Sequence, residues 1–296
     1  MTHPVWRSLQ YVPAHVEKYV QSAHTRGADG IILDLEDSVP LELKGQARAG
    51  VAAAAELCGQ AGADILVRIN RPPEMALADI AAAIGPRVTA LCLPKVDSVE
   101  HLREIEGLVA EAEATAGLNV GHTRFWILIE CAAGYLEMAA IAKASARNVA
   151  MTLGSEDFAL DVGMEPDEEI LRGPKQQMII AAAAAGLMPL GVISGATRFD
   201  DPEGYLVMAR RSRRFGFLGS SCIHPSQIPL LNQAFSPTEA EIAHAARVVT
   251  EAVAAELAGR GAFSIDGKMI DPPIVARAQA VIDRQAAIAK RTARLA

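Results

Sequence analysis

Short apolar runs alternate along the chain with longer segments in which apolar and polar residues recur at helical spacing. The short runs have the length of β-strands, and most are apolar at nearly every position, which is typical of strands buried on both faces of a parallel sheet. There are eight of them, at residues 9–12, 30–36, 65–70, 90–96, 125–130, 148–154, 190–194 and 215–223. The pattern therefore predicts a parallel sheet of eight strands.

The longer segments between these runs predict helices, because they are rich in Ala, Leu, Glu and Arg and contain few helix-breaking residues. Two of the segments follow residues that commonly open a helix, Asp97-Ser98 in one case and Asp200-Asp201-Pro202 in the other. The helical pattern is clearest at residues 41–57, 99–116, 132–144, 168–185 and 202–214.

A strand followed by a helix, repeated eight times in about 235 residues, is typical of a TIM (β/α)8 barrel. An open doubly wound sheet is the main alternative, and it would carry a glycine-rich phosphate-binding turn after the first strand. Residues 11–15, Tyr-Val-Pro-Ala-His, contain no such turn. We therefore expect an α/β protein with a catalytic TIM barrel over residues 1–235.

The last part of the chain, residues 236–296, has a different pattern. Residues 237–258 predict a helix opened by Ser236-Pro-Thr-Glu239, which has the form of a capping box. A glycine-containing turn, a hairpin-like segment at 262–273 and a final helix follow. Two helices and a hairpin are too few residues for a large core of their own. We expect a C-terminal extension or lid that packs on the barrel or on an adjacent subunit.

Charge and composition restrict the partners. The chain has 28 Lys and Arg residues against 35 Asp and Glu, a formal net charge of -7, so binding to nucleic acid or to an anionic membrane is not expected. A local basic patch for a phosphorylated substrate remains compatible with this balance. The four cysteines are widely spaced, which predicts free buried thiols. Neither a signal peptide nor a membrane-spanning segment is recognisable, so we expect a cytoplasmic protein.

Ionisable residues stand at the ends of several predicted strands. Because the C-terminal ends of barrel strands meet on one face, these charges should line a common pocket. Glu130 and Asp157 each follow an apolar strand, and two carboxylates with room for water and substrate oxygens suit Mg²⁺. Either carboxylate alone is also compatible with a role in capping the next helix.

Arg68 lies within a predicted strand, where an arginine is costly to bury without an anionic partner. Its guanidinium suits a clamp on a substrate carboxylate or enolate oxygen, which we favour, but also an internal salt bridge to Asp34 or Glu36. Strand alternation places Asp34 and Glu36 on one side and Asp37 on the other, unless the strand has already turned. We expect these three carboxylates to support Arg68 or the metal site.

Two further residues at strand ends have alternative interpretations. Lys95 has the setting of a Schiff-base lysine, but beside an arginine and metal-type carboxylates a rim charge or supporting ion pair is the favoured interpretation. His224, after the last strand, is either a general base or a partner of the nearby loop backbone.

Taken together, these residues resemble the citrate lyase β-subunit-like branch of the HpcH/HpaI aldolase superfamily, which holds malyl-CoA and citramalyl-CoA lyases. The resemblance implies a Mg²⁺-dependent TIM barrel that cleaves or forms a carbon–carbon bond in a 3-hydroxyacyl thioester. The matching stretches follow the family's order and are RSLQYVP at 7–13, GADGIILDLEDSV at 27–39, VRIN at 67–70, LPK at 93–95, IE at 129–130, GSED at 154–157, GFLG at 216–219, IHPSQ at 223–227 and GKMIDP at 267–272.

The resemblance also implies residue roles. Glu130 and Asp157 match the magnesium ligands, Arg68 matches the substrate-binding arginine, and Asp271 matches an aspartate that an adjacent subunit contributes as acid or base. It therefore implies a homotrimer or homohexamer with Asp271 crossing the interface. The substrate-binding positions are Arg68, Glu130, Gly154 and Ser155, and those for coenzyme A are Pro13, His15 and Lys18.

The activity implied is retro-Claisen cleavage of citramalyl-CoA or malyl-CoA to acetyl-CoA and a small 2-oxo acid. Close alternatives are a malyl-CoA thioesterase and a malate-synthase-like enzyme, because both use the same enolate chemistry. A citrate lyase β subunit acting on citryl-acyl-carrier protein, a class II pyruvate aldolase and a non-catalytic binding protein are the remaining alternatives. One methyl group in a pocket changes binding by only about 1–3 kcal/mol, so the sequence leaves the substrate open.

Overall fold

The computed structural model describes residues 3–194, 200–257, 259 and 261–295. Contacts within the chain divide it into two units, Met1–Phe235 and Ser236–Ala296, and each unit has its own architecture. None of the helices in the described ranges combines the length and the apolar character needed to cross a membrane.

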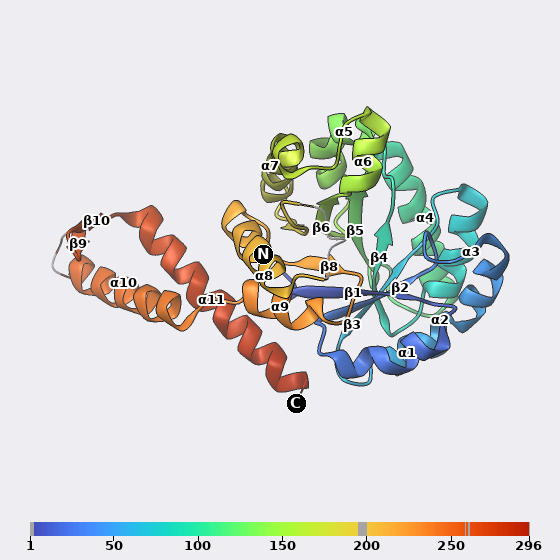
Figure 1. The fold of residues 1–296 in the computed structure, drawn as a ribbon, viewed down its shortest axis with the longest axis horizontal. Helices are drawn as coiled ribbons and strands as arrows, with labels where there is room; N and C mark the ends of the chain where they lie inside the picture. The colour runs from blue at the N-terminus through green and yellow to red at the C-terminus, as the bar shows by residue number, and fades with distance from the viewer. Residues whose placement is uncertain (1–2, 195–199, 258, 260, 296) are drawn as a thin grey trace. The chain divides into compact units, whose positions relative to one another are not determined.

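The first unit is built on one parallel sheet in the order β7-β6-β5-β4-β3-β2-β1-β8 (Figure 1). A β-bridge between Leu190 and Gly219 joins its two ends, supported by hydrogen bonds from Leu218 N to Pro189 O and from Gly191 N to Gly219 O. The sheet is therefore closed into a barrel. Its strands are β1 (Ser8–Pro13), β2 (Gly30–Asp34), β3 (Asp64–Arg68), β4 (Val88–Leu93), β5 (Arg124–Ile129), β6 (Asn148–Leu153), β7 (Met188–Pro189) and β8 (Ser220–Cys222).

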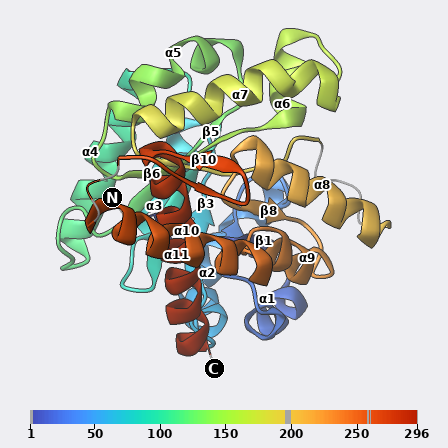
Figure 2. The same ribbon diagram turned by 90° about the vertical axis from the view of Figure 1, so that its left-hand side faces the viewer.

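Helices follow the strands in turn and surround them (Figures 1 and 2), so the predicted TIM barrel is confirmed. Two predicted helix starts are also confirmed: Ser98 Oγ accepts from His101 N, and Asp201 Oδ1 accepts from Gly204 N. The helices are α1 (Glu17–Ala23), α2 (Lys44–Cys58), α3 (Pro73–Ala83), α4 (Val99–Thr115), α5 (Ala132–Lys143), α6 (Ser155–Val162), α7 (Glu168–Ala184), α8 (Pro202–Phe215) and α9 (Gln227–Ala234), with short 3-10 turns at His24–Arg26 and Leu41–Leu43.

The last two strands differ from their predicted ranges. The run at 215–223 shortens to β8 because α8 continues to Phe215, and Gly216, with φ 123°, ends that helix. The run at 190–194 does not form the seventh strand. Met188 and Pro189 form it, and Leu190 extends their pairing through its bridge to Gly219. Residues 192–194 do not continue the strand, and their carbonyls accept hydrogen bonds from the Lys175 ammonium.

Two apolar layers hold the barrel together. An inner cluster fills the barrel, with Ile32, Leu66, Trp126 and Leu128 among its fully or almost fully buried side chains. A larger cluster packs the helices on the outside of the sheet. The four cysteines are free as predicted, although Cys131 is only half-buried.

A buried ion pair lies at the end of the barrel where β5 and β6 begin. Arg147 donates to both carboxylate oxygens of Glu113, at 2.7 and 2.8 Å, and Thr123 N donates to the same carboxylate at 2.7 Å. Burial acts to raise the pKa of Glu113, but the hydrogen bonds from Arg147 and two backbone amides lower it to about 2. Charges at this end of a TIM barrel serve stability, because catalysis uses the opposite end.

The second unit consists of α10 (Glu239–Leu257), a hairpin of β9 (Phe263–Ile265) and β10 (Lys268–Ile270), and α11 (Pro272–Leu295). The two-residue turn Asp266-Gly267 has positive φ at both positions, as its hairpin geometry requires. The first helix of the second unit was predicted to begin at residue 237, which is wrong by two residues. The capping box is formed by Thr238 and Glu241, not by Ser236 and Glu239, and the helix begins at Glu239.

Candidate active site

A cavity of about 430 Å³ lies at the C-terminal ends of the barrel strands. Its wall includes residues from the ends of β1, β2, β3, β5, β6 and β8, as expected for the functional face of a TIM barrel. Six residues predicted to belong to the site line it: Asp34, Asp37, Arg68, Glu130, Gly154 and Ser155. The strand order therefore brings together residues that are up to 121 positions apart in the chain.

Arg68 is held by a bidentate ion pair. Asp34 and Arg68 are register partners on the adjacent strands β2 and β3, so their side chains leave the sheet side by side. Arg68 Nε donates to Asp34 Oδ1 and Arg68 Nη2 to Asp34 Oδ2, each at 2.7 Å. Burial acts to raise the pKa of Asp34, but the bonds from Arg68 and Ser38 keep it below its ordinary value. The internal salt bridge is therefore present, and it fixes the guanidinium at the cavity wall.

Two more carboxylates contact the same guanidinium. Arg68 Nη1 lies 2.8 Å from Glu36 Oε2 and 3.0 Å from Asp37 Oδ2. The chain has turned after Asp34, whose carboxylate accepts from the backbone amides of Glu36 and Ser38, so Asp37 does not point away as simple alternation suggests. The Asp37 side chain is 57% exposed, whereas that of Glu36 is 9% exposed. Asp37 is therefore the partner that an entering anion can replace most readily.

Glu130 is buried at the end of β5 and fitted closely to its surroundings. Its Oε2 atom accepts from Lys95 N at 2.9 Å, and a Cβ atom added at Gly154 would lie 2.6 Å from both its Cγ and Oε1 atoms. Burial, followed by the nearby charge of Asp157, raises the pKa of Glu130 to about 7. Burial in the same way raises the pKa of Glu36 to about 7. The site therefore holds more carboxylate groups than its cations neutralise.

Lys95 connects the two groups of carboxylates. Its φ of 51° is unusual for a residue with a side chain, and its ammonium lies 3.3 Å from Asp157 Oδ1 and 3.5 Å from Glu36 Oε1. Burial acts to lower the pKa of Lys95, but Glu36 and Asp157 raise it above its ordinary value. A lysine that stays protonated is a poor Schiff-base nucleophile, so the geometry favours the ion-pair interpretation.

Asp157 and its neighbour Glu156 both stand in the first turn of α6, but they differ in position. Glu156 lines the cavity, while Asp157 reaches the Lys95 ammonium. Within the described ranges, no three side chains of the His, Cys, Asp and Glu types are arranged to hold a metal ion. Mg²⁺ is commonly held by one or two carboxylates, with water or substrate completing its shell.

Among the cavity residues that the sequence analysis missed, three have a distinct chemistry. Tyr11 stacks its ring on Arg68, with the guanidinium carbon 4.8 Å from the ring centre. Thr152 lines the cavity and donates to the Leu190 carbonyl. Trp126 also lines it, and its buried indole N–H has no hydrogen-bond partner among the described residues. Alternation along the strands was the available signal, because Tyr11, Thr152 and Trp126 each lie two residues from another position whose side chain faces the inside of the barrel.

Other predicted residues lie elsewhere. Asp271 belongs to the second unit, where its Oδ1 atom accepts from Ile274 N in the first turn of α11. His15 lines a separate cavity between α1 and α2, and Lys18 is exposed on α1, whereas Pro13 ends β1 as a register partner of Asp34. His224 Nδ1 lies 2.7 Å from Ser226 Oγ and accepts from Ser226 N, so it contacts its own loop. A role of these residues with coenzyme A or in proton transfer stays a prediction.

Strand ends that surround a charged cavity are typical of a TIM-barrel enzyme. Residues 7–225 match the model of the HpcH/HpaI aldolase/citrate lyase family, and the chain therefore belongs to this family. The match confirms the resemblance found in the sequence, and with it the expectation of an enzyme of the lyase class.

Three similar proteins illustrate the range of the family. The chain is 34% identical over 279 residues to citrate lyase subunit beta from Leuconostoc mesenteroides subsp. cremoris, with 93% of this chain and 92% of that protein covered. It is 31% identical over 290 residues to (3S)-malyl-CoA thioesterase from Cereibacter sphaeroides, with 97% of this chain and 96% of that protein covered. A similar solved structure is the crystal structure of protein CitE from Mycobacterium tuberculosis in complex with magnesium, acetoacetate and coenzyme A. It matches this chain with a TM-score of 0.75 and 29% sequence identity, and the match covers 94% of this chain and 97% of that one.

Proposed function

We propose that the chain is a Mg²⁺-dependent carbon–carbon lyase that cleaves a 3-hydroxyacyl-CoA thioester, of the citramalyl-CoA or malyl-CoA type, to acetyl-CoA and a 2-oxo acid. The observation that carries the proposal is the excess of carboxylate groups around the buried Glu130, in a cavity that is also lined by the Arg68 guanidinium, which Asp34 holds in place. The solved relative that holds magnesium and coenzyme A supports the same class of chemistry.

Glu130 and Asp157 would hold the magnesium ion. Both offer hard carboxylate oxygens, and the raised pKa of Glu130 indicates negative charge that a divalent cation would stabilise. When bound, Mg²⁺ supplies Lewis acidity that makes a substrate hydroxyl group more acidic. Lys95 would keep Asp157 oriented through its ammonium group, and Gly154 would leave room for the Glu130 carboxylate.

Arg68 would bind the anionic part of the substrate and stabilise the charge that develops. In the cleavage, the hydroxyl group gives up a proton, the carbon–carbon bond breaks to give the 2-oxo acid, and the electron pair of that bond moves into an acetyl-thioester enolate. The proton later added to the enolate carbon balances the one that the hydroxyl group gave up. Arg68 faces the cavity and is prevented from moving by Asp34, so it would stabilise the enolate oxygen without reorganising. The substrate would replace Asp37, the exposed partner of the guanidinium.

Asp271 from another copy of the chain is proposed to protonate the enolate carbon. This is testable by mixing two inactive variants, Arg68→Lys and Asp271→Asn, under conditions that exchange subunits. If neighbouring copies share a site, random mixing restores about a quarter of the wild-type activity, because half of the barrels keep Arg68 and half of their neighbours keep Asp271. No recovery in verified mixed oligomers would contradict a shared site.

The main assay follows acetyl-CoA release from malyl-CoA, citramalyl-CoA and citryl-CoA with and without Mg²⁺. A thioesterase, the activity named for one relative at 31% identity, would release free coenzyme A and an intact hydroxy acid. A citrate lyase β subunit, the activity named for the relative at 34%, would act on citryl-acyl-carrier protein and leave the coenzyme A esters uncleaved. If no thioester is cleaved although the protein binds coenzyme A, the lyase proposal fails.

Two adjacent carboxylates provide a matched test of the metal site. Asp157→Asn should abolish Mg²⁺ binding measured by calorimetry, whereas Glu156→Gln, one residue away in the same helical turn, should leave the dissociation constant within about threefold. The reverse result would assign the metal to Glu156.

A further inference from the structure

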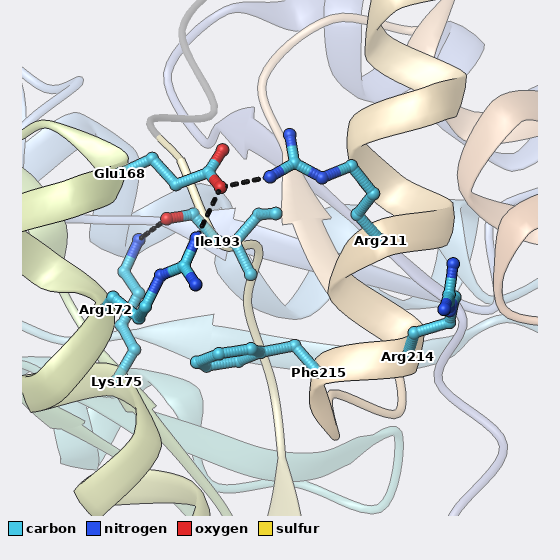
Figure 3. Close-up of a pocket in the computed structure, with 7 residues that line it drawn as sticks. All are labelled: Glu168, Arg172, Lys175, Ile193, Arg211, Arg214 and Phe215. Carbon is cyan, nitrogen blue, oxygen red and sulfur yellow. Dashed lines mark hydrogen bonds and ion pairs between the residues drawn. The ribbon is translucent and has the colours of Figure 1, made fainter.

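A second cavity lies in the barrel unit, outside the candidate active site. It has a volume of about 270 Å³ and lies between α7 and α8, and we call it the basic cleft. In Figure 3, side chains from the two helices face one another across it, with Ile193 between them. Its lining residues are Glu168, Arg172, Lys175, Ile193, Arg211, Arg214 and Phe215.

Positive charge in the basic cleft exceeds negative charge. Four of the lining residues are cationic, and Glu168 is the single carboxylate among them. Arg211 forms an ion pair with Glu168, while the nearest nitrogen of Arg172 is 3.7 Å from the same carboxylate. The Arg214 side chain makes no ion pair or hydrogen bond within the described part of the chain. One carboxylate therefore faces three arginines, in a chain whose net charge is negative.

Lys175 adds a buried positive charge to the wall of the basic cleft. The residue is only 2% exposed, and its ammonium donates to the carbonyl oxygens of Val192, Ile193 and Ser194 at 2.8, 3.2 and 3.3 Å. Carbonyl dipoles satisfy its hydrogen bonds. Burial lowers the pKa of Lys175 to about 8, although the charges of Glu156 and Glu168 act to raise it. An anion in the cleft would add to the negative charge that these two carboxylates provide.

The basic cleft shares a wall with the active-site cavity. Ile193 lines the cleft, whereas its neighbours Val192 and Ser194 line the cavity. The carbonyl groups of all three residues accept hydrogen bonds from Lys175 on α7. Ile193 N donates to Ser212 Oγ on α8 at 3.0 Å, so both helices hold this segment. A ligand bound in the cleft therefore contacts the same short segment that forms part of the catalytic cavity.

We propose that the basic cleft is a binding site for a phosphate-type oxyanion. Arg172 and Arg211 point toward one another across the opening, and Arg214 stands farther along the wall on α8 (Figure 3). Arginine binds the several oxygens of a phosphate group through paired hydrogen bonds. The cleft volume accommodates such a group together with a small organic portion against Ile193 and Phe215. The phosphate can come from free inorganic phosphate or from a phosphorylated nucleotide.

The test measures binding of two probes, inorganic phosphate and adenosine 3′,5′-bisphosphate, to the full chain by calorimetry at low ionic strength. Both probes should lose affinity as salt is added, because exposed arginines are screened. Arg214→Met should weaken binding of the true ligand at least about tenfold, since it removes a charge-assisted contact. Arg214 has no partner in the described protein to lose, so the variant should fold normally.

Arg210→Met is the matched control, because Arg210 carries the same charge on the same helix but does not line the cleft. It should leave the dissociation constant within about twofold. Hydrogen exchange should show protection at residues 191–194 and 211–215 when the probe is bound. Saturation by one probe alone identifies the source of the phosphate. The proposal is overturned if neither probe saturates, or if Arg214→Met and Arg210→Met bind both probes like the wild type.

Discussion

Gly154 offers the sharpest test of the candidate metal site, because its missing side chain is what leaves space for Glu130. Replacing it with alanine places a Cβ atom 2.6 Å from Glu130 Cγ and Oε1, where ordinary contacts begin near 3.4 Å. The backbone of Gly154 tolerates alanine, with φ -72° and ψ 109°, so the strain falls on the carboxylate. Relief requires the carboxylate to move by about 0.8 Å, more than the narrow range of magnesium–oxygen distances allows.

The expected result of Gly154→Ala is a loss of function with a small change in stability. A displacement near 1 Å typically costs about 10²-fold in rate, and we expect the Mg²⁺ dissociation constant to rise at least about tenfold. The free energy of unfolding should fall by only about 1–2 kcal/mol, since overpacking is partly offset by the lower entropy of the unfolded chain. Calorimetric Mg²⁺ titration, thioester cleavage and chemical denaturation measure these three quantities.

Gly107→Ala is the matched control. Gly107 lies within α4 with no atom within 4 Å of an added Cβ, so alanine should stabilise the helix by up to about 1 kcal/mol and leave Mg²⁺ binding unchanged. If Gly154→Ala binds Mg²⁺ and turns over substrate like the wild type, the position of the Glu130 carboxylate does not matter for the metal. The reasoning about this site would then be refuted.

Three further predictions concern charge. Arg68→Met should lower the free energy of unfolding by about 3–5 kcal/mol because it leaves Asp34 buried without its partner, and adding Asp34→Asn should recover most of this loss in denaturation experiments. Protons and Mg²⁺ compete for Glu130, whose pKa is raised to about 7, so the apparent Mg²⁺ dissociation constant should be about tenfold weaker at pH 6 than at pH 8. A constant value across this range in calorimetry would contradict that assignment. Arg147→Met should destabilise the protein by about 3–5 kcal/mol at the opposite end of the barrel while Mg²⁺ affinity, measured in the same way, stays within about twofold.

The order of strands and helices was predictable because a barrel strand buried on both faces is a continuous apolar run, and the intervening helices are not. The prediction failed where apolar character does not distinguish a strand from its neighbours. Phe215 continues the apolar run toward β8 but belongs to α8, and residues 192–194 are apolar or small yet give their carbonyls to Lys175. Only the second error depends on a hydrogen-bond partner distant in sequence, because α8 ends through bonds from Gly216 N to the nearby Ser212 and Arg213 carbonyls.

The candidate site was predictable as far as strand ends mark it. Arg68 and Glu130 follow this rule, and both line the cavity. The pairing of Arg68 with Asp34 depends on the register of β2 against β3, which no local pattern reveals. The left-handed backbone of Lys95, which aims its amide at Glu130, also gives no signal in the residue type. The capping box moved by two residues because two Ser/Thr-x-x-Glu patterns overlap near Pro237.

The register pairing of Asp34 with Arg68 links the assembly of the site to the folding of the chain. When β2 and β3 pair, the guanidinium and its counter-charge arrive on the same rung of the ladder. A slip of one residue would leave each charge facing an apolar neighbour, which raises the free energy of that misfolded pairing. The paired charges that line the cavity thus also favour the native alignment of β2 and β3 during folding.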